Sequence, residues 1–258
     1  MRYLALACDY DGTLATDGSV ARETVAALEQ LLASGRKLLL VTGRELPDLQ
    51  RVFPHLRLFD LVVAENGALL YRPRSGEEHP LCKEPSPEFV ERLKLHNLQP
   101  LSAGRCIVAT CQPHESLVLE TIRELGLQLR VTFNKGSVMV LPPGVNKGTG
   151  LKAALRELGI STHNVVGIGD AENDHSFLSA CECSVAVANA LEELKQRADV
   201  VTRGRNGRGV REVITELINS DLAAWEPRLK RHAGTEPRAS RKASAPADKS
   251  PPPSRTVE

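Results

Sequence analysis

Short apolar runs alternate with amphipathic segments along much of the chain. The runs hold consecutive apolar residues rather than an alternation of apolar and polar ones, which is typical of strands buried on both faces of a sheet. Between the first two runs, Val25, Leu28 and Leu32 recur at helical spacing and Gly35 follows them, which predicts a helix and its end. Alternating strands and helices predict an α/β fold with a parallel sheet. The predicted strands lie at residues 3–8, 37–42, 61–64, 164–169, 184–188 and 198–202.

The middle of the chain interrupts this alternation. Its pattern predicts a helix at 86–99, a strand at 104–111 and a second helix at 114–126. Two further strands are expected on either side of the Asn-Lys-Gly turn at 134–136. Helices and antiparallel strands in this order indicate a separate, smaller α+β unit.

The change of pattern divides the chain into three parts. We expect a Rossmann-like core with a parallel sheet from residues 1–72 and 143–220, and a small α+β cap domain inserted into it at 73–142. Residues 221–258 are rich in Pro, Ser, Ala and basic residues and have little apolar surface to bury, so we expect a disordered tail. Only the front of this tail, through Leu222 and Trp225, offers apolar side chains that can dock as part of a last helix.

Charge and composition narrow the class of protein. Residues 228–258 carry eight of the 33 Lys and Arg residues but three of the 32 Asp and Glu residues, so the rest of the chain is mildly acidic. That balance argues against a nucleic-acid-binding body. The chain has neither an apolar run of about 18 residues nor a signal-peptide pattern, which argues against a membrane protein. The six cysteines match no zinc spacing, and we expect reduced thiols in a cytoplasmic enzyme or binding protein.

Polar residues suited to metal and phosphate chemistry follow the predicted strands. In open parallel sheets, sites form beyond the carboxyl ends of the strands, so residues that follow different strands meet at one edge. Carboxylates suit Mg²⁺, and hydroxyl, amide and amine groups suit a phosphate. The sequence therefore predicts a Mg²⁺ and phosphate site there. Its residues are Asp9 and Asp11 after the first strand, Thr42, Gly43 and Arg44 after the second, Lys147 at the start of a later helix, and Asp170, Asn173 and Asp174 after the strand at 164–169.

Four short segments resemble, in order, the motifs of the haloacid dehalogenase (HAD) superfamily of phosphohydrolases. They are "DYDGT" at 9–13, "VTGR" at 41–44, "NKG" at 146–148 and "GDAEND" at 169–174. With the inserted cap and "VAENGA" at 63–68, the chain resembles the Cof-like subfamily IIB, which has a C2B cap and includes sugar phosphatases and phosphoglycolate phosphatases. The resemblance implies a Mg²⁺-dependent phosphomonoester hydrolase that acts on a small phosphorylated metabolite, a sugar phosphate or phosphoglycolate, through an aspartyl-phosphate.

The resemblance also implies a role for each matching residue. Asp9 is expected to be the nucleophile, and Asp11 to protonate the leaving oxygen and then to activate water. The expected Mg²⁺ ligands are the Asp9 carboxylate, the Asp11 backbone carbonyl, Asp170 and, directly or through water, Asp174. The residues expected to bind the phosphate are Thr42, Gly43, Lys147 and Asn173.

Other interpretations of these residues are weaker or stay open. A response-regulator receiver carries its phospho-acceptor after the third strand, where this chain has Ala64 and Glu65. A dinucleotide site requires a third glycine after Gly167 and Gly169. A phosphomutase, or a non-catalytic phosphate-binding domain that serves a tethered partner, remains an alternative. In the cap, the candidate substrate contacts are His114, Asn134 and Lys135.

Overall fold

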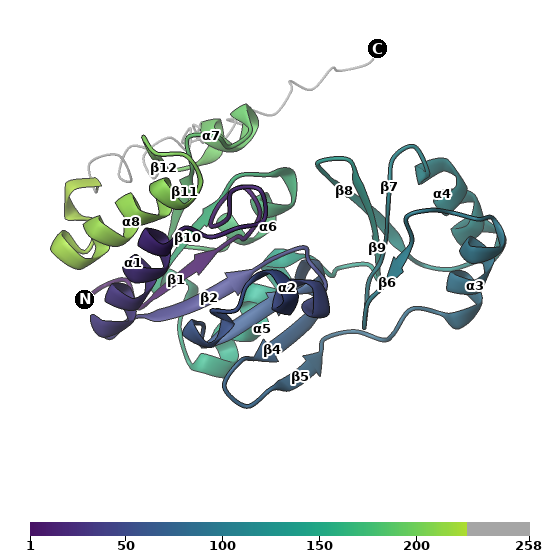
Figure 1. The fold of residues 1–258 in the computed structure, drawn as a ribbon, viewed down its shortest axis with the longest axis horizontal. Coiled ribbons are helices and arrows are strands. Elements are labelled where there is room, and N and C mark those ends of the chain that lie inside the picture. The colour runs from purple at the N-terminus through teal and green to yellow at the C-terminus, as the bar shows by residue number, and fades with distance from the viewer. Residues whose placement is uncertain (226–258) are drawn as a thin grey trace, which may run out of the picture.

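The chain forms two β-sheets in the computed structural model, which describes residues 1–225 (Figure 1). The large sheet lies in the core and the small one in the inserted segment. In spatial order the large sheet contains β12 (Val200–Val201), β11 (Cys183–Ala186), β10 (Val165–Gly169), β1 (Ala5–Cys8), β2 (Lys37–Val41), β3 (Leu61–Ala64), β4 (Leu69–Arg72) and β5 (Glu77–Pro80).

Six strands of the large sheet are parallel, from β12 through β3 in spatial order. Strands β4 and β5 extend the sheet as an antiparallel hairpin at one edge. The predicted α/β fold is therefore confirmed, and each of the six predicted core strands is present.

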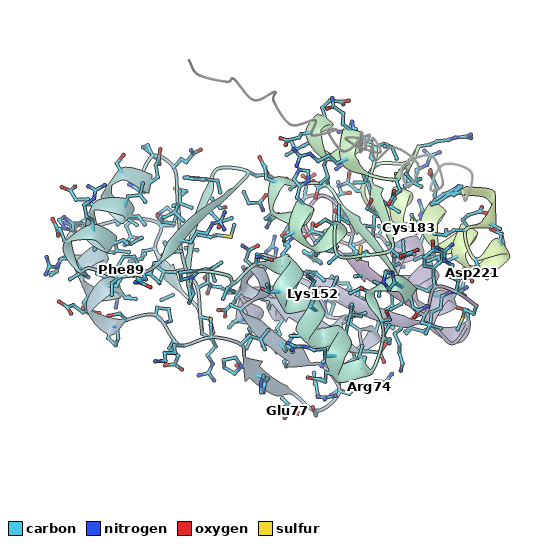
Figure 2. All side chains as sticks on the ribbon, turned by 180° about the vertical axis from the view of Figure 1, so that it is seen from behind. Arg74, Glu77, Phe89, Lys152, Cys183 and Asp221 are labelled. Atoms are coloured by element: carbon cyan, nitrogen blue, oxygen red, sulfur yellow. The ribbon has the colours of Figure 1, made fainter. Side chains whose placement is uncertain are left out.

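Helices cover both faces of the large sheet. One face carries α1 (Arg22–Ala33) and α8 (Asn206–Ser220), which pack against each other. The opposite face carries α5 (Lys147–Leu158), in front of the sheet when the molecule is seen from behind (Figure 2), together with α6 (His175–Leu178). Two further helices, α2 (Leu46–Val52) and α7 (Glu192–Arg197), complete the core.

This double cover explains the uniformly apolar strands. Every residue of β1, β3 and β10 is buried, because each side chain, whichever face it points to, meets a helix. Their side chains belong to one continuous apolar cluster with those of α1, α5 and α8. Burial of apolar surface at about 25 cal/mol per Å² makes this cluster the main source of stability in the core.

Strand β1 occupies the point where the strand order reverses. It pairs with β10 on one side and with β2 on the other, and both pairs are parallel. The loops that leave the carboxyl ends of β1 and β10 therefore run to opposite faces and leave a crevice between them. Asp9 and Asp170 are the first residues after these two strands.

The small sheet is antiparallel and is covered by helices on one face only. Phe89 of α3 and Val118 of α4 pack with Val108 and Val140 of the sheet. Ala109 and Met139, from the same strands but one position along, line a pocket on the opposite face. The elements are β6 (Ser102–Ala103), β7 (Val108–Cys111), β9 (Ser137–Leu141) and β8 (Arg130–Asn134) in spatial order, with α3 (Pro87–Leu95) and α4 (Glu115–Glu124).

Strand β5 departs from the expected layout of the insertion. The sequence placed the cap at 73–142, but Glu77–Pro80 pairs with β4 in the large sheet rather than with any strand of the small one. A four-residue polar strand carries no signal of which sheet it joins. The hairpin partner decides it, since β4 and β5 are neighbours in the chain and antiparallel neighbours need only a short turn.

Disorder was expected from residue 221, but residues 221–225 are ordered and dock on the core through Leu222 and Trp225, the two side chains that the sequence offered for docking. Helix α8 ends at Ser220, Leu222 is fully buried, and Trp225 ends a 3₁₀ helix (η5, Ala223–Trp225) that packs against the core. Asp221 accepts a hydrogen bond from Arg36 Nη2 at 2.9 Å, which fixes the turn to the base of the sheet. The predicted disorder of residues 226–258 lies outside the described part of the chain.

No helix within residues 1–225 is both long enough and apolar enough to cross a membrane. None of the six cysteines, all of which lie within residues 1–225, takes part in a disulfide.

We predict that Leu222→Ala lowers the free energy of unfolding by about 2–5 kcal/mol, because it empties a fully buried site between α8 and the sheet. Chemical denaturation of the purified protein measures this change. Leu119→Ala on α4 is the control, since that side chain is exposed and its loss should change stability by less than about 0.5 kcal/mol. Equal stability of the two variants would contradict the docking of residues 221–225.

Candidate active site

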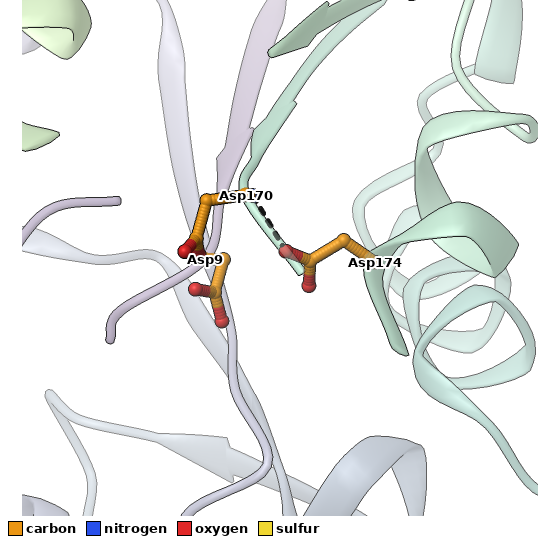
Figure 3. Close-up of side chains that lie close together, drawn as sticks. All are labelled: Asp9, Asp170 and Asp174. Atoms are coloured by element: carbon orange, nitrogen blue, oxygen red, sulfur yellow. Dashed lines mark hydrogen bonds between the residues drawn. The ribbon is translucent and has the colours of Figure 1, made fainter. Parts of the chain in front are cut away.

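Three buried aspartates meet at the switch point of the large sheet. Asp9 follows β1, Asp170 follows β10, and Asp174 ends a 3₁₀ helix (η4, Glu172–Asp174). One carboxylate oxygen of each lies within 4.8 Å of those of the other two (Figure 3). Their side chains are almost inaccessible to solvent. Such a cluster is costly unless cations offset the charge.

Lys147 supplies one of these cations. Its ammonium nitrogen donates to Asp9 Oδ1 and to Asp174 Oδ1, each at 2.6 Å, and the side chain is 1% exposed. Asn146 caps α5 by accepting a hydrogen bond from the Thr149 N–H, which fixes the helix start from which Lys147 projects. Burial alone lowers the pKa of Lys147, but the two carboxylates raise it more, so the group stays charged.

Asp174 connects Lys147 to the loop after β10. Its Oδ2 accepts hydrogen bonds from the backbone N–H groups of Asp170 at 2.8 Å and of Ala171 at 3.0 Å. Both oxygens of Asp174 are thus engaged, and its position four residues after Asp170 explains how the side chain turns back onto that loop. Asp174 therefore fixes the positions of Lys147 and of the loop after β10.

The remaining charges of the centre are not balanced by Lys147 alone. Burial raises the pKa of Asp9, Asp174 adds to the rise, and Lys147 opposes it. Burial also raises the pKa of Asp170, against hydrogen bonds from Lys135 and Thr13. Because the pKa values of Asp9 and Asp170 are both raised, the binding of additional positive charge to the centre is favourable.

Asp11 lies at the rim of the site, outside the cluster of three carboxylates. Its oxygens accept hydrogen bonds from Arg44 Nε and Nη2, both at 2.7 Å, in a bidentate ion pair. Arg44 also pairs with Asp48 on α2. The carboxylate of Asp11 is therefore held between the first and second motifs, while its backbone carbonyl faces the centre.

Three of the residues predicted to bind phosphate, Thr42, Gly43 and Asn173, lie together at the turn after β2. Thr42 is buried, and its hydroxyl oxygen accepts the N–H of Arg44 at 3.1 Å, which shapes the turn around Gly43. Asn173 donates to Asn66 Oδ1 at 3.1 Å, and its amide lies against Gly43. The Asn173 Oδ1 atom is buried and has no partner among the described residues, so it is available to a ligand.

The small sheet forms the roof of a pocket over the centre. The pocket has a volume of about 560 Å³ and opens above Asp9 and Asp11. From the cap it is lined by Ser102, Ile107, Ala109, Asn134, Lys135, Ser137 and Met139.

Of the three cap residues suggested by the sequence, two lie at this pocket and one does not. Lys135 reaches down from the β8–β9 turn, and its ammonium nitrogen lies 2.7 Å from Asp170 Oδ2 and 3.1 Å from the Asp11 carbonyl oxygen. Asn134 lines the pocket beside it. His114 instead lies part-buried at the start of α4, where its Nε2 lies 3.0 Å from the Gln99 carbonyl oxygen.

Glu65 is a residue of the site that the sequence analysis overlooked. Its buried carboxylate accepts the N–H groups of Arg105 at 2.9 Å, Cys106 at 2.7 Å and Ile107 at 3.1 Å, all in the β6–β7 turn of the cap. A Cβ on Gly104 would lie 2.7 Å from this carboxylate, so only glycine fits there. A carboxylate directly after a buried strand, at the same edge as Asp9, was the available signal.

The oxygen atoms between β1 and β10 fit a small divalent cation. Asp9, Asp170 and the Asp11 carbonyl offer hard oxygen ligands of the kind that Mg²⁺ prefers. Gly12, with φ of +84°, lets the loop approach closely, because a Cβ there would lie 2.4 Å from Asp170 Oδ2. The ammonium group of Lys135 already bridges two of these oxygens, which shows that the position accepts a cation.

A model of the haloacid dehalogenase-like hydrolases matches residues 6–112 and 113–214. The chain belongs to this family. Its members include relatives similar to this HAD-like hydrolase over most of their length. A phosphoglycolate phosphatase of Methanothermobacter thermautotrophicus is 31% identical over 83% of this chain and 98% of its own. Phosphoglycolate phosphatase 2 of Saccharolobus solfataricus is 29% identical over 85% of this chain and 94% of its own.

Solved structures share the fold of this hydrolase. A HAD-like hydrolase from Bacteroides thetaiotaomicron aligns with a TM-score of 0.72 and 21% identity, over 83% of this chain and 99% of that one. A sugar phosphatase of HAD subclass IIB aligns with a TM-score of 0.65 and 21% identity, over 83% and 98% of the two chains. The family and the phosphatase class expected from the motifs are confirmed.

We predict that Lys147→Met lowers the free energy of unfolding by about 3–5 kcal/mol near pH 8, because it leaves buried carboxylates without their cation. The loss should shrink toward pH 5. A carboxyl whose pKa is raised in the folded state stabilises the fold at low pH, and this stabilisation is lost as pH rises through the raised value. Urea denaturation with a chelator at both pH values measures the difference. Lys152→Met on the exposed side of α5 (Figure 2) is the control, and an equal loss at both pH values would contradict the prediction.

We predict that Glu65→Gln loosens the β6–β7 turn. The amide NH₂ would replace one acceptor oxygen and face a backbone donor, which costs about 1–3 kcal/mol. Hydrogen exchange of the amides of residues 105–107 should become faster, by up to about tenfold for each 1.4 kcal/mol lost if the turn opens locally. Exposed Glu84→Gln in the same segment serves as the matched control, and unchanged exchange in Glu65→Gln would refute this role.

Proposed function

We propose that this chain is a Mg²⁺-dependent phosphomonoester hydrolase that works through a phosphorylated Asp9. The observation that carries the proposal is the placement of Asp9 beside Lys147 and Asp170, at the floor of a pocket that the cap closes. The family shows the class of reaction, and the matched relatives named above include phosphoglycolate phosphatases. The cytoplasmic location expected from the sequence is part of the proposal.

Asp9 is proposed to attack the phosphorus atom of the substrate. One carboxylate oxygen is held by Lys147, so the other forms the new bond to phosphorus while the bond to the leaving oxygen breaks. Water then cleaves the acyl phosphate, inorganic phosphate leaves, and Asp9 is regenerated. Lys147 stabilises the charge that gathers on the phosphoryl oxygens, which is the main requirement of such transfers.

Asp11 is proposed to protonate the leaving oxygen and to take a proton from the attacking water. Its carboxylate lines the pocket but is held by Arg44, so it must exchange one of these hydrogen bonds for the leaving group. Between the two steps, the ion pair with Arg44 keeps the Asp11 carboxylate at the rim of the site. The acid and the nucleophile thus have different surroundings, which lets them serve different roles.

The phosphate and the metal are proposed to lie on two sides of Asp9. Thr42, the Gly43 backbone, Asn173 and Lys147 would bind the phosphoryl oxygens, and the unpartnered Asn173 Oδ1 would accept from a water or hydroxyl of the ligand. Asp9, Asp170 and the Asp11 carbonyl would hold Mg²⁺, with Asp174 orienting the loop. When bound, the ion neutralises charge on the phosphoryl group as a Lewis acid.

The substrate is proposed to be a small phosphorylated metabolite, with phosphoglycolate first and sugar phosphates second. The named relatives favour phosphoglycolate, and the pocket of about 560 Å³ admits either. A phosphomutase remains the alternative, since it would use the same Asp9 but return the phosphoryl group to the substrate. Inorganic phosphate as the product distinguishes the hydrolase from it.

Phosphate release tests the proposal directly. Phosphoglycolate, several sugar phosphates and p-nitrophenyl phosphate are incubated with the protein, with Mg²⁺ or with a chelator. We expect release that requires Mg²⁺ and falls at least about 1,000-fold in Asp9→Asn, because the amide is a poor nucleophile. Asp17→Asn, at an exposed position of the same loop, should keep full activity.

Two results would contradict the proposal. Undiminished release by Asp9→Asn would place the chemistry elsewhere. Accumulation of an isomeric phosphate ester in place of inorganic phosphate would assign the protein to the mutases.

A further inference from the structure

Lys135 is a cap residue whose ammonium group lies inside the catalytic centre of the core. It stands in the turn between β8 and β9, where Lys135 and Gly136 both have positive φ (47° and 83°), as a two-residue hairpin turn requires. Its nitrogen lies 2.7 Å from Asp170 Oδ2 and 3.1 Å from the Asp11 carbonyl oxygen. Through this one side chain the small sheet is bound to the loops after β1 and β10.

The same two oxygens are ligands in the proposed metal site. Mg²⁺ binds oxygen at about 2.0–2.1 Å and holds its remaining ligands in a near-octahedral shell. An ammonium group in contact with both oxygens leaves no space for that shell. Lys135 and the metal therefore exclude each other.

The cap wall of the pocket shows where Lys135 can go once it is displaced. Among the described residues, this wall offers the Asn134 amide and the hydroxyl groups of Ser102 and Ser137, and the carboxylates that line the pocket all belong to the core. Lys135 is its single charged group. The pocket's other cation, Arg44, is already bound to Asp11 and Asp48. A displaced Lys135 is thus the cation that faces the leaving group of a substrate.

We propose that Lys135 has two successive partners. In the metal-free protein it occupies the place of the divalent cation and ties the cap to the core. Metal binding expels it into the pocket, where it selects substrates whose leaving group carries a carboxylate. The inference rests on the proposed phosphohydrolase function, and it names the chemical class of substrate.

The displacement is tested by Mg²⁺ binding without any substrate. Titration calorimetry with MgCl₂ should show about tenfold tighter binding to Lys135→Met than to wild type, because the internal competitor is gone. Lys94→Met is the matched control, since it removes one positive charge from the cap at an exposed position on α3, and its affinity should equal that of wild type. Equal Mg²⁺ affinity of Lys135→Met and wild type overturns the proposal.

Hydrogen exchange separates displacement from a simple change of charge. In wild type, Mg²⁺ should speed the exchange of amides in β8 and β9 near the turn, because the tie to the core is broken. In Lys135→Met the same amides should exchange fast without Mg²⁺ and respond little to it. Exchange that ignores Mg²⁺ in wild type contradicts the displacement.

The selection is tested by a pair of substrates that differ in one carboxylate. We expect Lys135→Met to lower kcat/KM for phosphoglycolate about 100-fold and for ethyl phosphate less than about threefold, whereas Lys94→Met changes neither. Lys135→Arg should retain most of the preference, because it keeps the positive charge. An equal loss on both substrates overturns the selective role.

The outcomes separate this inference from the proposed function. If wild type releases no phosphate from any substrate, the proposed function fails, while the Mg²⁺ titration still decides whether Lys135 competes with the metal. If wild type hydrolyses phosphoglycolate and Lys135→Met matches it in both Mg²⁺ affinity and kcat/KM, the function stands and the inference is wrong.

Discussion

The contact of Lys147 with two buried carboxylates is the interaction on which the centre depends. Without this cation, Asp9 and Asp174 would be buried charges of one sign, and the loops after β1 and β10 would be driven apart or protonated. Asp174 also fixes the loop that carries Asp170, because its second oxygen accepts hydrogen bonds from the backbone of that loop. The start of α5 and the end of β10 are therefore placed by one ammonium group.

Two charged contacts of opposite direction join the cap to the loops at the carboxyl ends of the core strands. Glu65 of the core accepts three backbone N–H groups of the β6–β7 turn, and Lys135 of the cap donates to oxygens of the core. The first contact uses backbone donors that no ion can replace. The second uses a cation at a position built from oxygen ligands, which other cations can take. The contact at Glu65 is thus fixed, whereas the contact at Lys135 can be exchanged for one with another cation. This suits a cap that must let substrate into the pocket.

The acidic pair after β1 is separated by its surroundings. Asp9 is buried beside Lys147, whereas Asp11 is part-exposed and bound to Arg44. One residue between them suffices, because the strand ends at Cys8 and the loop turns at Gly12. The preceding apolar strand carries both carboxylates to the switch point, and the residues that meet them there decide that one faces the centre and the other the rim.

The sequence by itself determined the core and most of the centre. Uniform apolar strands can be stable only under helices on both faces, and a parallel sheet brings the residues after its strands to one edge. That argument is enough to place Asp9, Asp170 and Lys147 together from the sequence alone. It also predicted the Asn-Lys-Gly turn, since the turn chemistry is local.

Contacts between segments distant in the chain were decided only by the tertiary structure. The three hydrogen bonds from residues 105–107 to Glu65 depend on surfaces that meet only after the core has formed. The position of Lys135 in the centre depends on how the cap sits over the core. Local pattern carries no information on that placement, because a polar side chain at a turn looks the same in sequence whether it faces water or a carboxylate across the molecule.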